Sequence, residues 1–255
     1  MIIKSVITTI VFLVSYGAFL IGNIPSGWLV SRINPQLAAA HASLSDARGG
    51  AWTGSGQLRV NGTPLGRLSW DAGFWPLITG HLDADVKLQG NDIRARARVN
   101  AQRKSLRMTN LKGQADLQML ARLAHLPPEA QGTLVADIKA LRVSARGVIE
   151  TASGSIDIHG TRLPDLGVDL GTLHLVLQDS KADQGIHGMI SNDGGDLDIN
   201  GQLNLYHGDR YSLIAYLKPH PGSKNDPMRD ALAAVLGKPD SLGRYQYRVS
   251  GVLSR

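Results

Sequence analysis

The chain contains no cysteine, so disulfide bonds, thiolate metal sites and cysteine nucleophiles are all excluded. Because a protein without disulfides is tolerated in every compartment, this absence leaves the redox compartment open. Aromatic residues make up only 5% of the 255 residues, whereas 43% are hydrophobic, which is enough for a substantial core. Glycine is abundant at 29 residues, which is typical of a chain with many short strands and tight turns.

The chain also lacks the motifs that carry most enzyme and metal chemistry. It has no HExxH helix, no Gly-x-Ser-x-Gly turn and no phosphate-binding loop, and its eight histidines are scattered without a ligand spacing. The segment Asn192-Asp193-Gly194-Gly195-Asp196 occurs once and is interpreted as a hairpin turn with acidic neighbours, because calcium-binding repeats need stacked copies. We therefore predict no catalytic residue, no cofactor and no metal site, and a protein that is not an enzyme.

The net charge of +6 comes from one central region. Residues 90–150 contain eleven Lys and Arg but only five Asp and Glu, so the bases and acids of the remaining chain cancel. A basic region of this kind indicates an acidic partner or an anionic lipid surface as its target.

An uncharged stretch opens the chain. Residues 5–24 contain no charge, and at ~1.5 Å per residue they make a helix of about 30 Å, which is one hydrocarbon thickness. We expect an uncleaved transmembrane anchor over residues 1–24, and a cleaved signal peptide is the alternative. Lys4 precedes the stretch, so the positive-inside rule places the N-terminus in the cytoplasm and the rest of the chain across the membrane.

Residues 25–38 form a juxtamembrane segment. Trp28, Leu29 and Ile33 recur at nearly helical spacing, and tryptophan is favoured at the membrane interface. One interpretation is a short amphipathic helix on the bilayer, and the other is that Trp28 covers the first strands of the following domain.

The clearest β-strand pattern lies between Gly49 and Trp70. Two alternating segments, residues 57–60 and 67–70, flank an Asn61-Gly62-Thr63-Pro64 turn, and Asn-Gly is a strong hairpin signal. Glycines on both sides of Trp52 let the backbone bend around a large ring. We expect Trp52 and Trp70 to be structural anchors of the core.

Alternating strands then continue to the end of a β-rich domain over residues 39–255. Regularly spaced turns between them favour an antiparallel meander over βαβ units. Two short helices interrupt it, one over residues 116–125 and one that begins at Asp226-Pro227 and ends at Gly237. Because two helices cannot cover the apolar side of about a dozen strands, the sheet must close on itself or stay open as a curved sheet, half-barrel or groove.

The basic region contains a candidate docking strip. Arg94, Arg96 and Arg98 alternate along one predicted strand and therefore share one face. The strip continues through three further basic residues: Arg103, Lys104 and Arg107. It docks an acidic partner or anionic lipid, or it is a solvated edge strand whose charges prevent aggregation. We do not expect nucleic acid as a partner, because no aromatic residues accompany the arginines and a location across the membrane would remove the target.

Several of these motifs together resemble the type II secretion system protein N family. The resemblance rests on Gly49-Gly50-Ala51-Trp52-Thr53-Gly54-Ser55-Gly56-Gln57-Leu58-Arg59-Val60, Leu65-Gly66-Arg67-Leu68-Ser69-Trp70, Asn110-Leu111-Lys112-Gly113, Asn192-Asp193-Gly194-Gly195, Gly208-Asp209-Arg210-Tyr211 and Lys218-Pro219. It implies a mainly β, single-pass inner-membrane protein with a periplasmic domain that docks other type II secretion components. The chain is more remotely similar to AsmA-like envelope proteins, which implies an alternative function as a lipid-handling module with an open hydrophobic groove. None of the matched motifs transfers a site residue.

Overall fold

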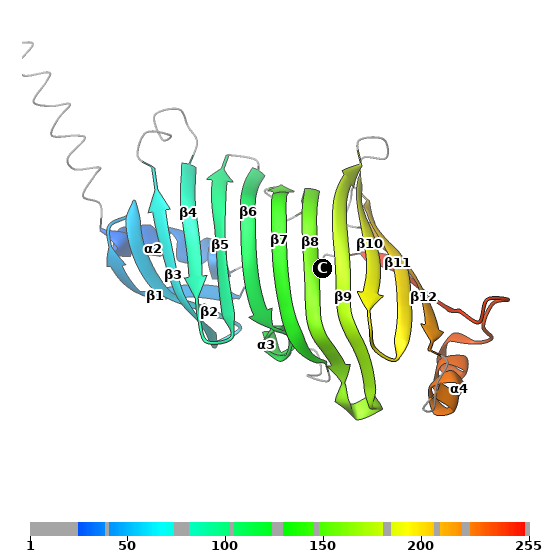
Figure 1. Ribbon diagram of the computed structural model, residues 1–255. Coiled ribbons are helices and arrows are strands. Elements are labelled where there is room, and N and C mark those ends of the chain that lie inside the picture. The colour runs from blue at the N-terminus through cyan, green and yellow to red at the C-terminus, as the bar shows by residue number, and fades with distance from the viewer. Residues whose placement is uncertain are drawn as a thin grey trace, which may run out of the picture. The chain divides into compact units, whose positions relative to one another are not determined.

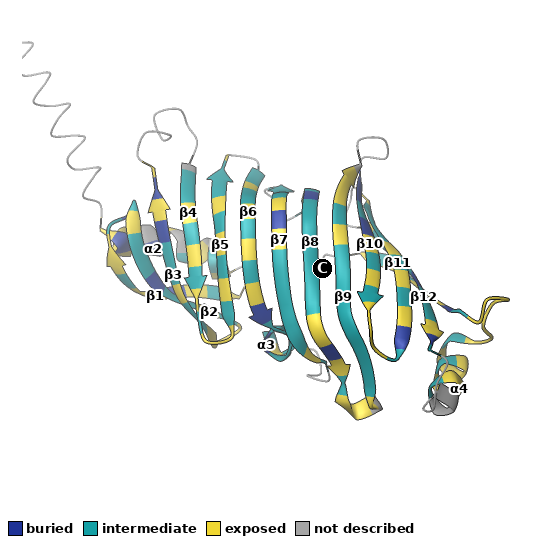
Figure 2. Cartoon of the chain, in the orientation of Figure 1, coloured by how far each residue is buried: buried dark blue, intermediate teal, exposed yellow. Residues whose placement is uncertain are grey.

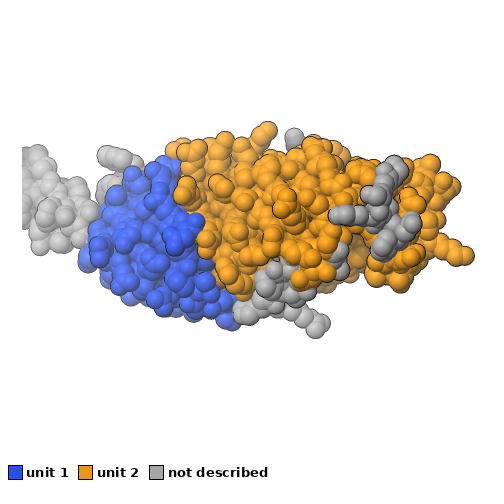
Figure 3. Space-filling view, turned by 60° about the horizontal axis from the view of Figure 1, so that its bottom comes forward, with its two compact units in different colours: residues 1–91 blue, residues 92–255 orange. Residues whose placement is uncertain are grey.

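The computed structural model describes the chain over residues 25–38, 41–73, 82–102, 105–123, 130–144, 148–180, 185–206, 210–220 and 225–252. The expected anchor over residues 1–24 lies outside them. Among the helices in the described ranges, none is both long and apolar enough to cross a membrane. Two compact units divide the chain, residues 1–91 and residues 92–255 (Figure 3).

The architecture is mainly β, as predicted. Thirteen described strands form an antiparallel, open sheet in which the strand order is the order of the chain (Figure 1). The first unit contains α2 (Ser26–Ala38), β1 (Ala42–Gly49), β2 (Thr53–Val60), β3 (Thr63–Ala72) and β4 (Leu82–Gln89). The second contains β5 (Ile93–Ala101), β6 (Ser105–Asp116), α3 (Leu117–Leu123), β7 (Gln131–Ser144), β8 (Ile149–Leu163), the 3₁₀ helix η2 (Pro164–Leu166), β9 (Val168–Ser180), β10 (Gly185–Asp193), β11 (Leu197–Tyr206), β12 (Arg210–Pro219), α4 (Asn225–Leu236) and β13 (Tyr245–Val252).

The expected Asn-Gly hairpin joins β2 and β3. Asn61 and Gly62 both have positive φ, at 50° and 75°, which is the backbone of the tight turns that match the twist of two antiparallel strands. The turn is shorter than predicted, because Thr63 and Pro64 already pair with β2 as the first residues of β3. Pro64 is exposed near the start of its strand, where the missing N–H costs least.

A small core holds the first unit together. Trp70 from β3 is 9% exposed and packs with Val30 from α2 and Leu44 from β1, and its indole Nε1 donates a hydrogen bond to the Ala51 carbonyl at 3.0 Å. A Cβ at Gly54 would lie 2.7 Å from Cζ2 of Trp70, so glycine is required where the ring crosses β2. Trp52 is only partly buried and is not a member of this core.

The helix α2 covers the outer edge of the first unit. It runs from Ser26 to Ala38 within the predicted segment, with Pro35 inside it, and contacts β1 and β2. Asn34 extends its side chain to Leu44 on β1, where Nδ2 donates to the carbonyl at 3.0 Å and Oδ1 accepts from the N–H at 2.9 Å. Trp28 remains 51% exposed, with the Arg32 guanidinium 5.6 Å from its ring centroid.

The sheet of the second unit separates its residues onto two faces. One register row, which we take to define the apolar face, runs through Ala95, Gly113, Ala136, Ile156, Leu175, Ile190, Gly201, Ala215 and Tyr247. A row of the opposite face, called the polar face below, runs through Arg94, Gln114, Val135, Asp157, His174, Ser191, Asn200, Tyr216 and Gln246. Exposed and partly buried residues alternate along the strands accordingly (Figure 2).

Both predicted helices are present in the second unit. Asp116 caps α3, because its carboxylate accepts a hydrogen bond from the Met119 N–H at 2.9 Å, and α3 contacts β6 and β7. The described part of this helix is Leu117–Leu123, with Met119 buried at 4% exposure, and the last two predicted residues lie outside the described ranges. The second helix, α4, ends at Gly237, which has a φ of 84° and donates its N–H to the Ala233 carbonyl, as the predicted glycine cap requires. It contacts β12 and β13.

Candidate functional site

The predicted arginine strip lies on the polar face of the second unit. Arg94, Arg96 and Arg98 are exposed at alternate positions of β5, and Arg107 is exposed on the neighbouring strand β6. Arg107 is opposite Asn100, which lies two positions after Arg98 on β5, so the side chain of Arg107 shares one face with the three arginines of β5. Two other predicted members, Arg103 and Lys104, lie outside the described residues.

The ladder adds two cations that the sequence analysis did not include in the strip. Lys112 on β6 lies directly opposite Arg96, and Arg142 on β7 lies directly opposite Arg107. Sequence alternation could have placed both residues on a polar face, but it could not reveal which residues they oppose, because register depends on the bulges between strands. Here β5 and β6 slip in register between Arg96 and Arg98.

Two acids approach this cationic surface from the next strand. Asp137 lies 3.0 Å from Lys112, and Glu150 lies 3.4 Å from Arg142. The Nε atom of Arg142 is shielded from solvent but has no hydrogen-bond acceptor, so the Glu150 carboxylate is near it without bonding to it. Because the side chains of both pairs are exposed by more than a third, each pair contributes little to stability.

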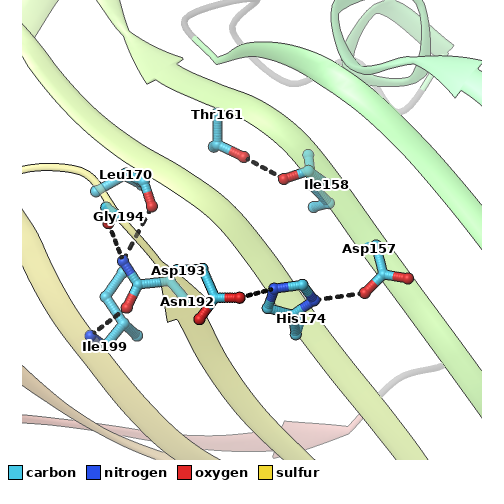
Figure 4. Close-up of polar contacts among 9 residues, drawn as sticks. All are labelled: Asp157, Ile158, Thr161, Leu170, His174, Asn192, Asp193, Gly194 and Ile199. Atoms are coloured by element: carbon cyan, nitrogen blue, oxygen red, sulfur yellow. Dashed lines mark hydrogen bonds and ion pairs between the residues drawn. The ribbon is translucent and has the colours of Figure 1, made fainter.

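A second polar cluster surrounds His174 on the same face (Figure 4). The ring of His174 on β9 lies between two carboxylates, with Nδ1 2.6 Å from Asp157 Oδ1 on β8 and Nε2 3.1 Å from Asp193 Oδ2 on β10. Both carboxylates are acceptors, so the geometry favours the ring that carries a proton on each nitrogen. The hydrogen bond to Asp157 is the main cause that raises the pKa of His174, and the weaker contact with Asp193 adds to it.

His220 forms a similar contact after the end of β12. Its Nε2 lies 2.6 Å from Asp198 Oδ1, and its Nδ1 lies 3.0 Å from the Gly195 carbonyl. The hydrogen bond to Asp198 is the main cause that raises the pKa of this histidine as well. Since each ring already uses both nitrogens, neither histidine has a nitrogen left over to accept a proton from a substrate.

Both histidines hold the turn between β10 and β11. His174 contacts this turn through Asp193, and His220 contacts it through the Gly195 carbonyl and through its own N–H, which donates to the Asp196 carbonyl. The expected hairpin turn is therefore present, and both neighbouring strands hold it by hydrogen bonds.

Asn192 organises the interior of the same turn. Its Nδ2 lies 3.0 and 2.9 Å from the carbonyl oxygens of Leu170 and Gly194, and its Oδ1 accepts from the Ile199 N–H at 2.7 Å (Figure 4). The same Nδ2 lies 2.7 Å from the Leu197 carbonyl oxygen. The contact with Leu170 reaches the preceding hairpin. The sequence analysis assigned no such role to Asn192, although an asparagine beside Asp-Gly-Gly is a signal for side-chain bonding to turn backbone.

The arginine surface and the histidine clusters can bind different kinds of groups. The arginine surface can bind anions, whereas the histidine clusters bind carboxylates of the same chain and thereby fix a turn. Within the described ranges, no group of three or more His, Asp and Glu is arranged to hold a metal ion.

Comparison with known proteins supplies the family. The model of the family described as type II secretion system (T2SS), protein N, matches residues 40–248. No curated protein and no solved structure matches the chain. The match covers most of the chain and confirms the resemblance that the strand and turn motifs indicated.

Proposed function

Because the chain belongs to the type II secretion system protein N family, we propose that it is a non-enzymatic component of the type II secretion machinery that docks other envelope components. Residues 1–24 anchor it in the inner membrane with a cytoplasmic N-terminus, residues 25–38 follow as the juxtamembrane segment, and residues 39–255 form a periplasmic β-rich domain. The family match over residues 40–248 is the observation that carries this proposal.

The N-terminal region supports the anchored topology. Residues 5–24 are uncharged, and a helix of that length spans about 30 Å. The helix α2 follows, and its Trp28 is exposed beside Arg32 rather than packed in the core of the first unit. An exposed Trp–Arg pair is suited to the headgroup region of a bilayer, where the ring and the guanidinium both find partners.

The arginine strip supports the docking role. Arg94, Arg96 and Arg107 are exposed on one face, and no acidic side chain in the described part of the chain forms an ion pair with them. A cluster of uncompensated charge on a rigid sheet steers and orients an oppositely charged partner. We assign this face to contact with other secretion components.

A secretion assay tests both parts of the proposal. Deletion of the chromosomal copy should reduce export of the folded exoproteins that use the type II pathway, and the wild-type chain should restore it. Complementation with Arg94→Glu, Arg96→Glu and Arg107→Glu combined should fail, whereas Arg248→Glu, an exposed cation on β13, should complement. Normal export in the deletion strain would refute a role in secretion, and full complementation by the triple variant would refute docking through this face.

The apolar face of the second unit supports a second candidate, an envelope lipid-handling module. Its register row contains no charged residue across nine strands, and the described strands provide no second sheet to cover it. Such a face can hold acyl chains. Native mass spectrometry of the detergent-extracted protein tests this function: copurified phospholipid supports it, and a protein that always emerges free of lipid does not.

A further inference from the structure

Two pairs of like charges lie directly opposite each other on neighbouring strands of the polar face. Arg96 on β5 faces Lys112 on β6, and Arg107 on β6 faces Arg142 on β7. Like charges in directly opposed positions destabilise a sheet, because the Cβ atoms of the two residues are only about 4.5–5.5 Å apart. A sheet that places two such pairs on one face gives up stability there, which is expected where a site serves a ligand rather than the fold.

In each pair, an acidic side chain of the sheet compensates the charge of only one of the two cations. Asp137 is 3.0 Å from Lys112, and Glu150 is 3.4 Å from Arg142. No acidic side chain among the described residues forms an ion pair with Arg96 or Arg107, and both are exposed. Each pair of cations therefore has one anion beside it, which leaves one positive charge in excess.

The spacing of the two pairs defines what fits them. Arg107 is opposite Asn100, which lies four positions after Arg96 on β5. At a rise of about 3.3 Å per residue, the two pairs are roughly 13 Å apart along the strand direction. In an extended peptide the same rise separates residues i and i+4, whose side chains project to the same side.

We propose that the pairs Arg96–Lys112 and Arg107–Arg142 are two anion-binding sites for an extended, acidic segment of a partner protein, with carboxylates four residues apart. The inference rests on the proposed docking role of the polar face and gives its partner a defined chemistry. Each carboxylate lies between two cations and relieves their repulsion.

The composition of this surface favours a protein, and not a membrane, as its binding partner. Membrane-binding faces combine cations with exposed aromatic or large aliphatic residues that enter the headgroup region. None of the large hydrophobic residues exposed in the described structure lies on β5, β6 or β7. Asp137 and Glu150 lie beside the cations and would repel anionic headgroups, but they can receive a basic residue of a protein partner.

The test uses the full-length protein in detergent and two synthetic peptides of identical composition. One peptide carries two glutamates four residues apart, and the other carries them three residues apart, which places them on opposite sides of an extended chain. The wild-type protein should bind the first peptide more tightly than the second. Arg96→Gln combined with Arg107→Gln should weaken binding of the first peptide by about tenfold or more, whereas the control Arg248→Gln should leave it unchanged.

Thermal stability supplies a second measurement, because the double variant removes the repulsion between the paired cations even when no partner is bound. At low salt the double variant should melt at or above the wild-type temperature, and the difference should vanish at high salt. Equal peptide affinity of wild type and double variant, or a wild type that does not distinguish the two peptides, would overturn the inference. So would arginine-dependent binding to phosphatidylglycerol vesicles in place of the peptide. Failure of the secretion role is separate, since it appears as normal export in the deletion strain while peptide binding persists.

Discussion

The side chain of Asn34 reproduces the hydrogen bonding of a neighbouring strand for Leu44. Its amide donates to the Leu44 carbonyl at 3.0 Å and accepts from the Leu44 N–H at 2.9 Å, so both backbone groups on the outer side of β1 are satisfied at this position. An exposed strand edge is a template for pairing with other chains, and proteins usually cover or charge it. In this chain one asparagine on α2 does so.

Asn34→Ala should therefore destabilise the first unit and expose the edge of β1. Loss of two side-chain hydrogen bonds to a partly buried backbone should lower the free energy of unfolding by about 1–3 kcal/mol. Urea unfolding measures this loss, and light scattering during the transition measures the tendency to aggregate. Ser31→Ala, which removes an exposed hydrogen bond within the same helix, is the matched control and should change neither.

Trp70→Ala should be the most damaging substitution in the first unit. The residue packs with Val30 and Leu44, so its truncation should lower the free energy of unfolding by about 3–5 kcal/mol. Trp52→Ala should cost less, because Trp52 is only partly buried. The two variants are compared by urea unfolding monitored by circular dichroism, and an equal loss for both would show that Trp52 is a core anchor of the same weight.

The stability of the second unit should fall as the pH rises above 6.5. Hydrogen bonds to Asp157 and Asp198 raise the pKa values of His174 and His220 above 6.5, so the folded state holds these protons more tightly than the unfolded chain. Their contribution is complete below pH 6.5 and is lost as the pH rises through the folded-state pKa values. Backbone amides in the turn between β10 and β11 should therefore lose protection from hydrogen exchange as the pH rises, by more than the intrinsic increase of the exchange rate with pH accounts for.

His174→Gln with His220→Gln isolates this effect. The double variant should be less stable than wild type in mildly acidic buffer, and its free energy of unfolding should fall less than that of wild type as the pH rises above 6.5. Urea unfolding at several pH values measures both properties. A wild-type stability that increases with pH through this range would contradict the assignment of the two protonated rings.

Asn192→Asp should disrupt the turn more than any neighbouring change of similar size. The substitution replaces a donor that faces three carbonyl oxygens by a carboxylate, which leaves those acceptors opposite a negative charge. We expect a loss of about 1–3 kcal/mol or more in the free energy of unfolding. Asn200→Asp, at an exposed position of β11, makes the same chemical change as a control and should be nearly neutral.

Alternation and turn chemistry predicted most of the fold. The Asn61-Gly62 hairpin and the glycine cap of α4 at Gly237 follow from local sequence, because the residues that form them are neighbours in the chain. The start of α4 lies one residue earlier than predicted, at Asn225. Trp52 and Trp70 show the limit of that reasoning. Both have glycines nearby in the sequence, but Trp70 lies on β3 and packs with Val30 of α2, whereas Trp52 lies in the bend before β2. No local pattern specifies where a helix docks on a sheet.

The arrangement of the candidate site depended on register, which sequence alternation does not determine. The arginines of β5 were predictable as one face. The register that places Lys112 opposite Arg96 and Arg107 opposite Asn100 depends instead on the bulge near Asn110, a non-glycine residue with a φ of 52°. A shift of the ladder at that point would have placed other side chains opposite the arginines. The hydrogen bonds of His174 likewise join three strands and have no counterpart in spacing along the chain.

The order of the strands also determines how this protein can be built. Because the sheet runs from β1 to β13 in the order of the chain, each described hairpin pairs with material that has already been synthesised. Such a topology has little need for distant segments to find each other, so folding can begin at the N-terminal end and progress in the direction of synthesis. The last strands complete the width of the sheet without being needed to close it, and a chain that ended before β12 would lose width while keeping every earlier ladder.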